Sequence, residues 1–165
     1  MNKTVAICVA LTAFVIVAAP VRSHEGHSHE SYSAGEPGDP KKPSRTIEVD
    51  MSEMDFTPSR IEVKRGEQIR FVIRNVGTED HEFLLSTTEE NLKHAALMKK
   101  FPHMEHDDPN GVRLGPKKSA EILWKFTKAG TFEYSCLIPD HREYGMIGHV
   151  TVKQGEESRA KGRSR

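Results

Sequence analysis

Residues 134–146 read YSCLIPDHREYGM, and three side chains in this stretch, those of Cys136, His141 and Met146, can each bind a soft metal ion. Their spacing is C-x4-H-x4-M. A thiolate, an imidazole and a thioether supply three ligands of a type 1 copper site, which has two His, one Cys and a weak axial Met. His81, in the sequence DHEF at the head of an apolar run, is the candidate for the missing imidazole. The sequence therefore predicts one copper ion bound by His81, Cys136, His141 and Met146.

Each ligand taken alone has an ordinary structural explanation. A lone Cys in an exported protein is usually half of a disulfide, and a lone Met usually fills the core. The combination and its spacing favour copper instead. Loss of the first 23 residues would also remove Cys8 and leave Cys136 without a disulfide partner. A bound metal ion would occupy this thiol and protect it from oxidation.

Residues 1–23 resemble a signal peptide. Lys3 supplies the positive start, Thr4 to Pro20 is almost entirely apolar, and Ser23 ends a short segment suited to cleavage. The apolar run is short for a membrane span, although a retained N-terminal anchor is the alternative. We expect export to the periplasm and no membrane-spanning segment in the mature protein.

The charge balance excludes one class of partner. The chain has 24 basic and 24 acidic residues, and removal of Lys3 and Arg22 leaves 22 against 24. Nucleic-acid binding would require a basic surface. We expect no nucleic-acid partner.

Both ends of the mature chain are predicted to be disordered. Residues 24–44 are polar and show no hydrophobic periodicity, and residues 154–165 form a short basic tail. The first tail contains His24, His27 and His29, which is compositional evidence for a weak extra copper site. A solvated tail without metal is an equally good interpretation.

Residues 45–153 are predicted to form an all-β domain, a Greek-key β-sandwich. Short runs with alternating apolar residues recur between turn sequences, for example at 46–49, 56–63, 68–76 and 148–152. In residues 131–136 the alternation places Phe132, Tyr134 and Cys136 on one face. The sulfur of Cys136 is therefore expected to point into the core.

Residues 86–116 follow a different pattern and are interpreted as a partly helical insertion. Ser86 and Glu89 suggest a capping box, and a helix is expected from about Thr88 to Lys100. Its predicted packing face contains His94, Leu97, Met98 and Phe101. A second copper site is the alternative, and its candidate ligands are His94, Met98, His103, Met104 and His106.

The ligand pattern and the strand pattern together resemble the cupredoxins, the small blue copper proteins. The Cys136–Met146 loop is similar to azurin- and rusticyanin-type loops. The resemblance implies that His81 is the upstream ligand and that His141 lies nearest the surface, where electrons enter and leave. It also implies an apolar docking rim around His141, formed by Leu137, Ile138, Pro139 and Ile147.

Glu82 departs from the family pattern. Many cupredoxins have Asn after the upstream His, where it connects the two ligand segments near the sulfur. Hydrogen bonds around the sulfur tune the potential, so no potential can be carried over to this chain. The His-rich start and the His/Met insertion resemble exported cupredoxins associated with bacterial copper tolerance.

Two functions follow as expectations. The first is a monomeric periplasmic carrier of single electrons that alternates between Cu(I) and Cu(II) and docks a redox partner near His141. The second is a copper-tolerance protein that binds or oxidises excess periplasmic copper, uses additional His/Met sites and docks a copper-handling partner. No arrangement of nucleophile, base or paired carboxylates stands out, so we do not expect an enzyme.

Overall fold

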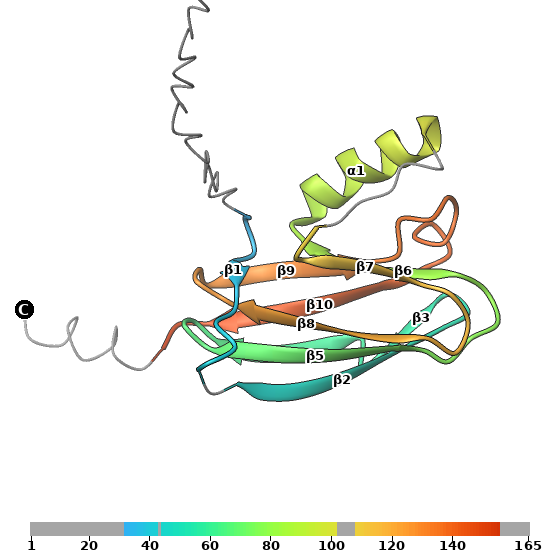
Figure 1. The fold of residues 1–165 in the computed structure, drawn as a ribbon. Coiled ribbons are helices and arrows are strands. Elements are labelled where there is room, and N and C mark those ends of the chain that lie inside the picture. The colour runs from blue at the N-terminus through green and yellow to red at the C-terminus, as the bar shows by residue number, and fades with distance from the viewer. Residues whose placement is uncertain (1–31, 43, 102–107, 156–165) are drawn as a thin grey trace, which may run out of the picture.

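The computed structural model describes residues 32–42, 44–101 and 108–155, and these form two sheets packed face to face (Figure 1). The all-β sandwich expected from the sequence is confirmed. One sheet has the strand order β1 (Glu36–Pro37), β8 (Ser119–Lys125), β5 (Gln68–Asn75), β2 (Arg45–Ser52), β3 (Asp55–Thr57). The other has the order β4 (Arg60–Lys64), β10 (Ile147–Lys153), β9 (Gly130–Ser135), β6 (His81–Ser86), β7 (Gly111–Leu114).

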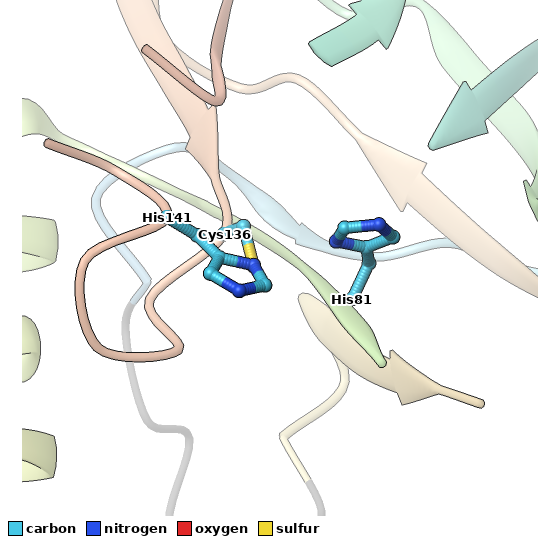
Figure 2. A group of neighbouring side chains, drawn as sticks. All are labelled: His81, Cys136 and His141. Carbon is cyan, nitrogen blue, oxygen red and sulfur yellow. The ribbon is translucent and has the colours of Figure 1, made fainter. Parts of the chain in front are cut away.

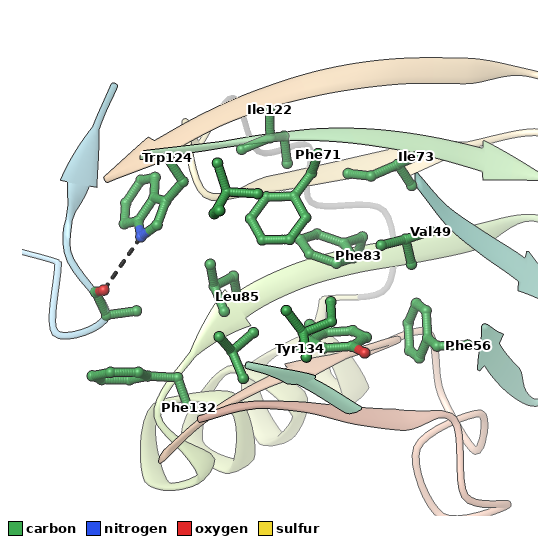
Figure 3. Packing of buried hydrophobic residues seen from close by; sticks show 14 of the residues in the cluster. Val49, Phe56, Phe71, Ile73, Phe83, Leu85, Ile122, Trp124, Phe132 and Tyr134 are labelled. Atoms are coloured by element: carbon green, nitrogen blue, oxygen red, sulfur yellow. Dashed lines mark hydrogen bonds between the residues drawn. The ribbon is translucent and has the colours of Figure 1, made fainter. Parts of the chain in front are cut away.

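The core lies between the two sheets and follows the predicted alternation. Ile69, Phe71 and Ile73 of β5 are fully buried, as the period of two requires. Phe71 packs on Phe83 of the opposite sheet with ring centroids 5.6 Å apart, and Phe83 stacks on Tyr134 at 5.2 Å (Figure 3). This aromatic layer fixes β6 and β9 side by side below the candidate ligands.

The run at residues 56–63 does not form a single strand. β3 pairs with β2 in one sheet, whereas β4 pairs with β10 in the other. The chain crosses between the sheets at Pro58 and Ser59, after a cis Thr57–Pro58 peptide bond. The period of two shifts by one residue at the crossing, because Phe56 is buried in β3 whereas Ile61 and Val63 are buried in β4. The prediction of one run overlooked this shift.

The expected disorder of residues 24–44 is wrong for the described part of that segment. β1 pairs with β8, Ala34 is fully buried, and Trp124 donates a hydrogen bond from Nε1 to the Ala34 carbonyl at 3.3 Å (Figure 3). This polar stretch is ordered by its backbone pairing with β8 and by its contact with the Trp124 ring. Neither interaction can be predicted from the composition of the stretch. His24, His27 and His29 lie outside the described residues, as do residues 1–23 and 156–165.

The predicted helix is confirmed as α1 (Thr88–Lys100), which lies on the outer face of the β6–β9 sheet (Figure 1). Its capping box is formed by Thr87 and Glu90, one residue later than the sequence suggested. The predicted packing face is also wrong in part, because Leu97 and Phe101 are exposed. The buried residues of α1 are Asn91 and Met98, since a polar network lies beneath the helix. No helix within the described residues is long and apolar enough to span a membrane.

Candidate metal centre

His81, Cys136 and His141 converge at one end of the β6–β9 sheet (Figure 2). One potential ligand atom from each residue lies within 4.8 Å of the others, and all three residues are buried. His81 begins β6, and Cys136 directly follows β9. Because β6 and β9 are neighbouring antiparallel strands, they bring together residues that are far apart in the sequence. The Cys136 Sγ atom lies 3.3 Å from Nδ1 of His141.

Met146, the fourth predicted ligand, lies at the end of the same loop and is fully buried. Its backbone closes the loop: the Cys136 N–H donates to the Met146 carbonyl at 3.2 Å, and the Met146 N–H donates to the His141 carbonyl at 3.1 Å. The two hydrogen bonds hold Met146 beside the other loop ligands. Its role as a weak axial ligand stays a prediction.

The donor groups of the site fit a metal ion. Nδ1 and Nε2 of His81 are both buried and have no hydrogen-bond partner among the described residues, an arrangement that is costly unless another group binds there. Burial and the neighbouring His141 lower the pKa of His81, which favours the neutral imidazole that binds metals. Burial raises the pKa of the Cys136 thiol to about 12, so a metal ion would have to displace its proton.

Glu82 connects the His81 strand to the Cys136 segment. Its backbone N–H donates to the Cys136 sulfur at 3.3 Å, and its carboxylate accepts a hydrogen bond from the Leu137 N–H at 3.1 Å. The sequence left open whether these segments are connected without the usual Asn. The structure shows that a carboxylate makes the connection.

The turn before His81 contains functional residues that the sequence analysis treated only as a strand end. Asn75 is buried, donates from Nδ2 to the carbonyls of Glu79 and Leu114, and accepts from the Gly77 N–H at 3.0 Å. A Cβ atom on Gly77 would lie 3.1 Å from Nε2 of His81. Asn75 therefore shapes the turn, and Gly77 leaves room for the imidazole. The Asn-x-Gly sequence was the available signal.

A buried ion pair supports the ligand loop from the outer face of the sheet. Arg142, next to His141, donates three hydrogen bonds to Glu133 at 2.9, 3.0 and 3.3 Å. Glu133 also accepts from Ser135 and from Asn91 of α1. Burial raises the pKa of Glu133, but these hydrogen bonds outweigh it and hold the pKa below its ordinary value. The insertion helix is thereby connected to the ligand loop.

His141 is the most accessible of the four predicted ligands, with 11% of its side chain exposed. Its Nε2 atom lies 3.6 Å from a Glu79 carboxylate oxygen. The expected apolar rim is incomplete, because Leu137 is buried in the core and only Pro139 of the predicted four is exposed. Tyr144 is 71% exposed and adds an aromatic side chain to this end of the molecule.

The described residues contain one group of His, Cys and acidic side chains close enough to share a metal ion. His94 does not belong to it, and Met98 is buried beneath α1. His103, Met104 and His106 lie outside the described residues. The structure therefore brings together the three predicted His and Cys ligands of the main site, and the second site stays a prediction.

The fold and the site together define a cupredoxin: a β-sandwich in which a Cys-His-Met loop closes over an upstream His. Comparison with known proteins agrees. The model of the copper binding proteins of the plastocyanin/azurin family matches residues 44–153, and the chain belongs to this family.

Three curated relatives carry the name copper-resistant cuproprotein CopI. The protein of Rubrivivax gelatinosus is 44% identical over 159 residues, covering 89% of this chain and 94% of the relative. The protein of Pseudomonas aeruginosa is 36% identical, covering 72% and 82%. The protein of Vibrio cholerae is 33% identical, covering 72% and 71%.

Solved structures of auracyanins have the same fold. Reduced auracyanin from Roseiflexus castenholzii superposes with a TM-score of 0.57 at 22% identity, covering 67% of this chain and 98% of that one. Auracyanin B gives a TM-score of 0.58 at 20% identity, covering 73% and 96%. At this level of identity the comparison concerns the fold alone.

Proposed function

We propose that this protein is an exported type 1 copper protein that exchanges single electrons in the periplasm. The observation that carries the proposal is the convergence of His81, Cys136 and His141 within 4.8 Å, with both nitrogens of His81 buried and unpartnered. Bound copper supplies a one-electron couple between Cu(I) and Cu(II) at such a site. No catalysis beyond electron transfer is expected.

The protein contributes fixed ligand positions and a dry environment. His81 and Cys136 are fixed by strands of one sheet, and the backbone hydrogen bonds of Met146 close the loop. Ligands fixed in this way change little between the two oxidation states, which favours fast transfer. His141 is the most accessible residue of the site, so we expect a monomer that docks its redox partner there.

Copper tolerance is the second candidate, and the names of the three curated relatives favour it. Under this proposal the protein binds excess copper, or oxidises Cu(I) and passes the electron to a partner that docks at His141. The two candidates share the same site. They differ in the physiological acceptor and in the use of further His and Met residues outside the described part.

A copper titration of the mature protein from His24 tests the site. We expect one equivalent of Cu(II) to produce an intense thiolate-to-copper absorption band, and Cys136→Ser to abolish it because a hydroxyl cannot replace the thiolate. Absence of the band in the unaltered protein would refute the proposal. Further equivalents that bind without added colour would favour additional sites and copper tolerance.

Gene deletion separates the two candidate roles. A copper-tolerance role predicts that deletion raises copper sensitivity and leaves respiration intact. An electron carrier that serves respiration predicts the opposite. Complementation with Cys136→Ser is the control, because this variant should fail in either role.

A further inference from the structure

A buried acid lies directly beside the metal ligands. Glu82 follows His81 on β6 and is 8% exposed. Its backbone N–H reaches the Cys136 sulfur, and its carboxylate reaches the backbone of the next residue, Leu137. Glu82 therefore contacts the segment Cys136–Leu137 through both main-chain and side-chain atoms.

A buried carboxylate is costly unless hydrogen bonds or an opposite charge compensate it. The Leu137 N–H supplies one hydrogen bond. Arg113 lies opposite Glu82 in the antiparallel register of β6 and β7, and its guanidinium pairs with Asp80 at 3.2 Å. The site is thus flanked by one buried acidic side chain and, on the neighbouring strand, by a half-exposed cation.

The Glu82 carboxylate can act in two ways, as a hydrogen-bond acceptor and as a charge, and an amide in its place would separate the two. An amide oxygen can also accept the Leu137 hydrogen bond, although more weakly than a carboxylate, and it carries no charge. A negative charge in a poorly hydrated site attracts a divalent ion more strongly than a monovalent ion at the same place. The carboxylate therefore adds an electrostatic preference to a connection that an amide could make.

We propose that Glu82 both positions the ligand loop and biases the copper centre toward Cu(II), which lowers its reduction potential. The inference rests on the proposed function of the site as a copper centre. It assigns a separate role to each part of one side chain: the hydrogen-bonding oxygen fixes the loop, and the charge sets the redox balance.

The variant Glu82→Gln tests the charge, because it keeps the acceptor oxygen. We expect the absorption band to be retained and the ratio of Cu(I) to Cu(II) affinity to rise at least tenfold, which is a rise in potential of about 59 mV for one electron. Glu121→Gln is the matched control, since Glu121 is an exposed carboxylate on the other sheet. Its potential should equal that of the unaltered protein.

The variant Arg113→Gln provides an independent test if Glu82→Gln folds poorly. Loss of the cation leaves Glu82 and Asp80 less compensated, so the potential should fall. If neither variant changes the ratio of Cu(I) to Cu(II) affinity by more than twofold, the electrostatic role of Glu82 is overturned. The proposed function as a copper site would still stand in that case, provided that the blue absorption band is present. Absence of the band from the unaltered protein would overturn both.

The variant Glu82→Ala tests the positioning role. It removes both the charge and the acceptor, so copper should dissociate faster from it than from Glu82→Gln. Equal dissociation rates for the two variants would overturn the positioning role, because the hydrogen bond to Leu137 would then have no effect on the loop.

Discussion

At the scale of single residues, the turn before β6 passes so close to His81 that position 77 has no room for a side chain. A Cβ atom there would lie 2.6 Å from a Glu53 carboxylate oxygen and 3.1 Å from Nε2 of His81. The carboxylate is exposed and can move, but the buried imidazole cannot move freely. A methyl group at this position would therefore displace the ligand.

We expect Gly77→Ala to weaken copper binding by about tenfold, the lower end of the range for changes next to ligands. Competition with a copper chelator measures this change. Gly115→Ala is the control, because its Cβ would meet its nearest neighbour, Asp80, at an ordinary 3.5 Å. If both variants bind copper with equal affinity, the turn must accommodate the methyl group without moving His81.

The sequence predicted the ligands better than their surroundings. Cys136, His141 and Met146 were predictable because they lie within one short loop with a diagnostic spacing. The roles of Glu82, Asn75 and Gly77 were not predictable in this way. The Asn-x-Gly sequence at 75–77 signalled a turn but not its closeness to His81. The contacts of Glu82 with Cys136 and Leu137 depend on how β6 and β9 pair, which no local pattern specifies.

At the scale of elements, α1 and the ligand loop are joined through a buried ion pair. Glu133 is 2% exposed, and the side chain of Arg142 is 16% exposed. The α1 residue Asn91 donates to Glu133 from one side, and Arg142 donates from the other. The insertion helix therefore stabilises the loop that contains His141 without supplying a ligand.

We expect Arg142→Gln to lower the free energy of unfolding by about 3 kcal/mol, because it leaves the buried Glu133 carboxylate without its cation. Urea denaturation of the copper-free protein measures the loss. The double variant Glu133→Gln/Arg142→Gln should recover most of it, since no buried charge remains. Equal losses in the single and double variants would contradict this account.

The same pair predicts a dependence on pH. The pKa of Glu133 is lower in the folded protein than its ordinary value of 4.5, because the hydrogen bonds to its carboxylate outweigh the effect of burial. Its contribution to stability is therefore present above pH 4.5 and is lost as pH falls through the lowered pKa. The unaltered protein should lose more stability on acidification than the double variant.

The regular strands were predictable from alternation, and the irregular elements were not. β5 and β9 have the predicted buried faces because alternate residues must face one core. β1 is two residues long and polar, so it is ordered by β8 and Trp124 and not by its own composition. The β3–β4 crossing was missed because both strands bury apolar residues in the same core, although the alternation shifts by one residue between them.

At the scale of the whole molecule, the segment 32–42 completes the sandwich. Tyr32 meets the edge of the Trp124 ring at a centroid distance of 5.5 Å, and Ala34 is buried beside it. The domain bounds predicted from the sequence, residues 45–153, leave this segment out. A protein that begins at residue 45 would expose part of the Trp124 ring to water.

We expect truncation to residue 45 to lower the free energy of unfolding by about 2 kcal/mol relative to a protein that begins at residue 31, the scale of exposing one large apolar side chain. Tryptophan fluorescence should shift to the red, and chemical denaturation should report the loss. The copper absorption band should not change, because the segment contacts the end of the sandwich remote from the ligands. Equal stabilities would contradict the proposed covering role.

The position of β10 governs when the ligands can meet. This strand is the last in the chain, yet it lies between β4 and β9 inside its sheet, and its parallel partner β4 begins at Arg60. A chain still emerging from a ribosome or a translocation channel lacks β10, so β4 has no neighbour and the loop from Cys136 to Met146 has no second anchor. We therefore expect the predicted ligands to come together, and copper to bind, only after β10 has emerged and paired, in the compartment where the protein finishes folding.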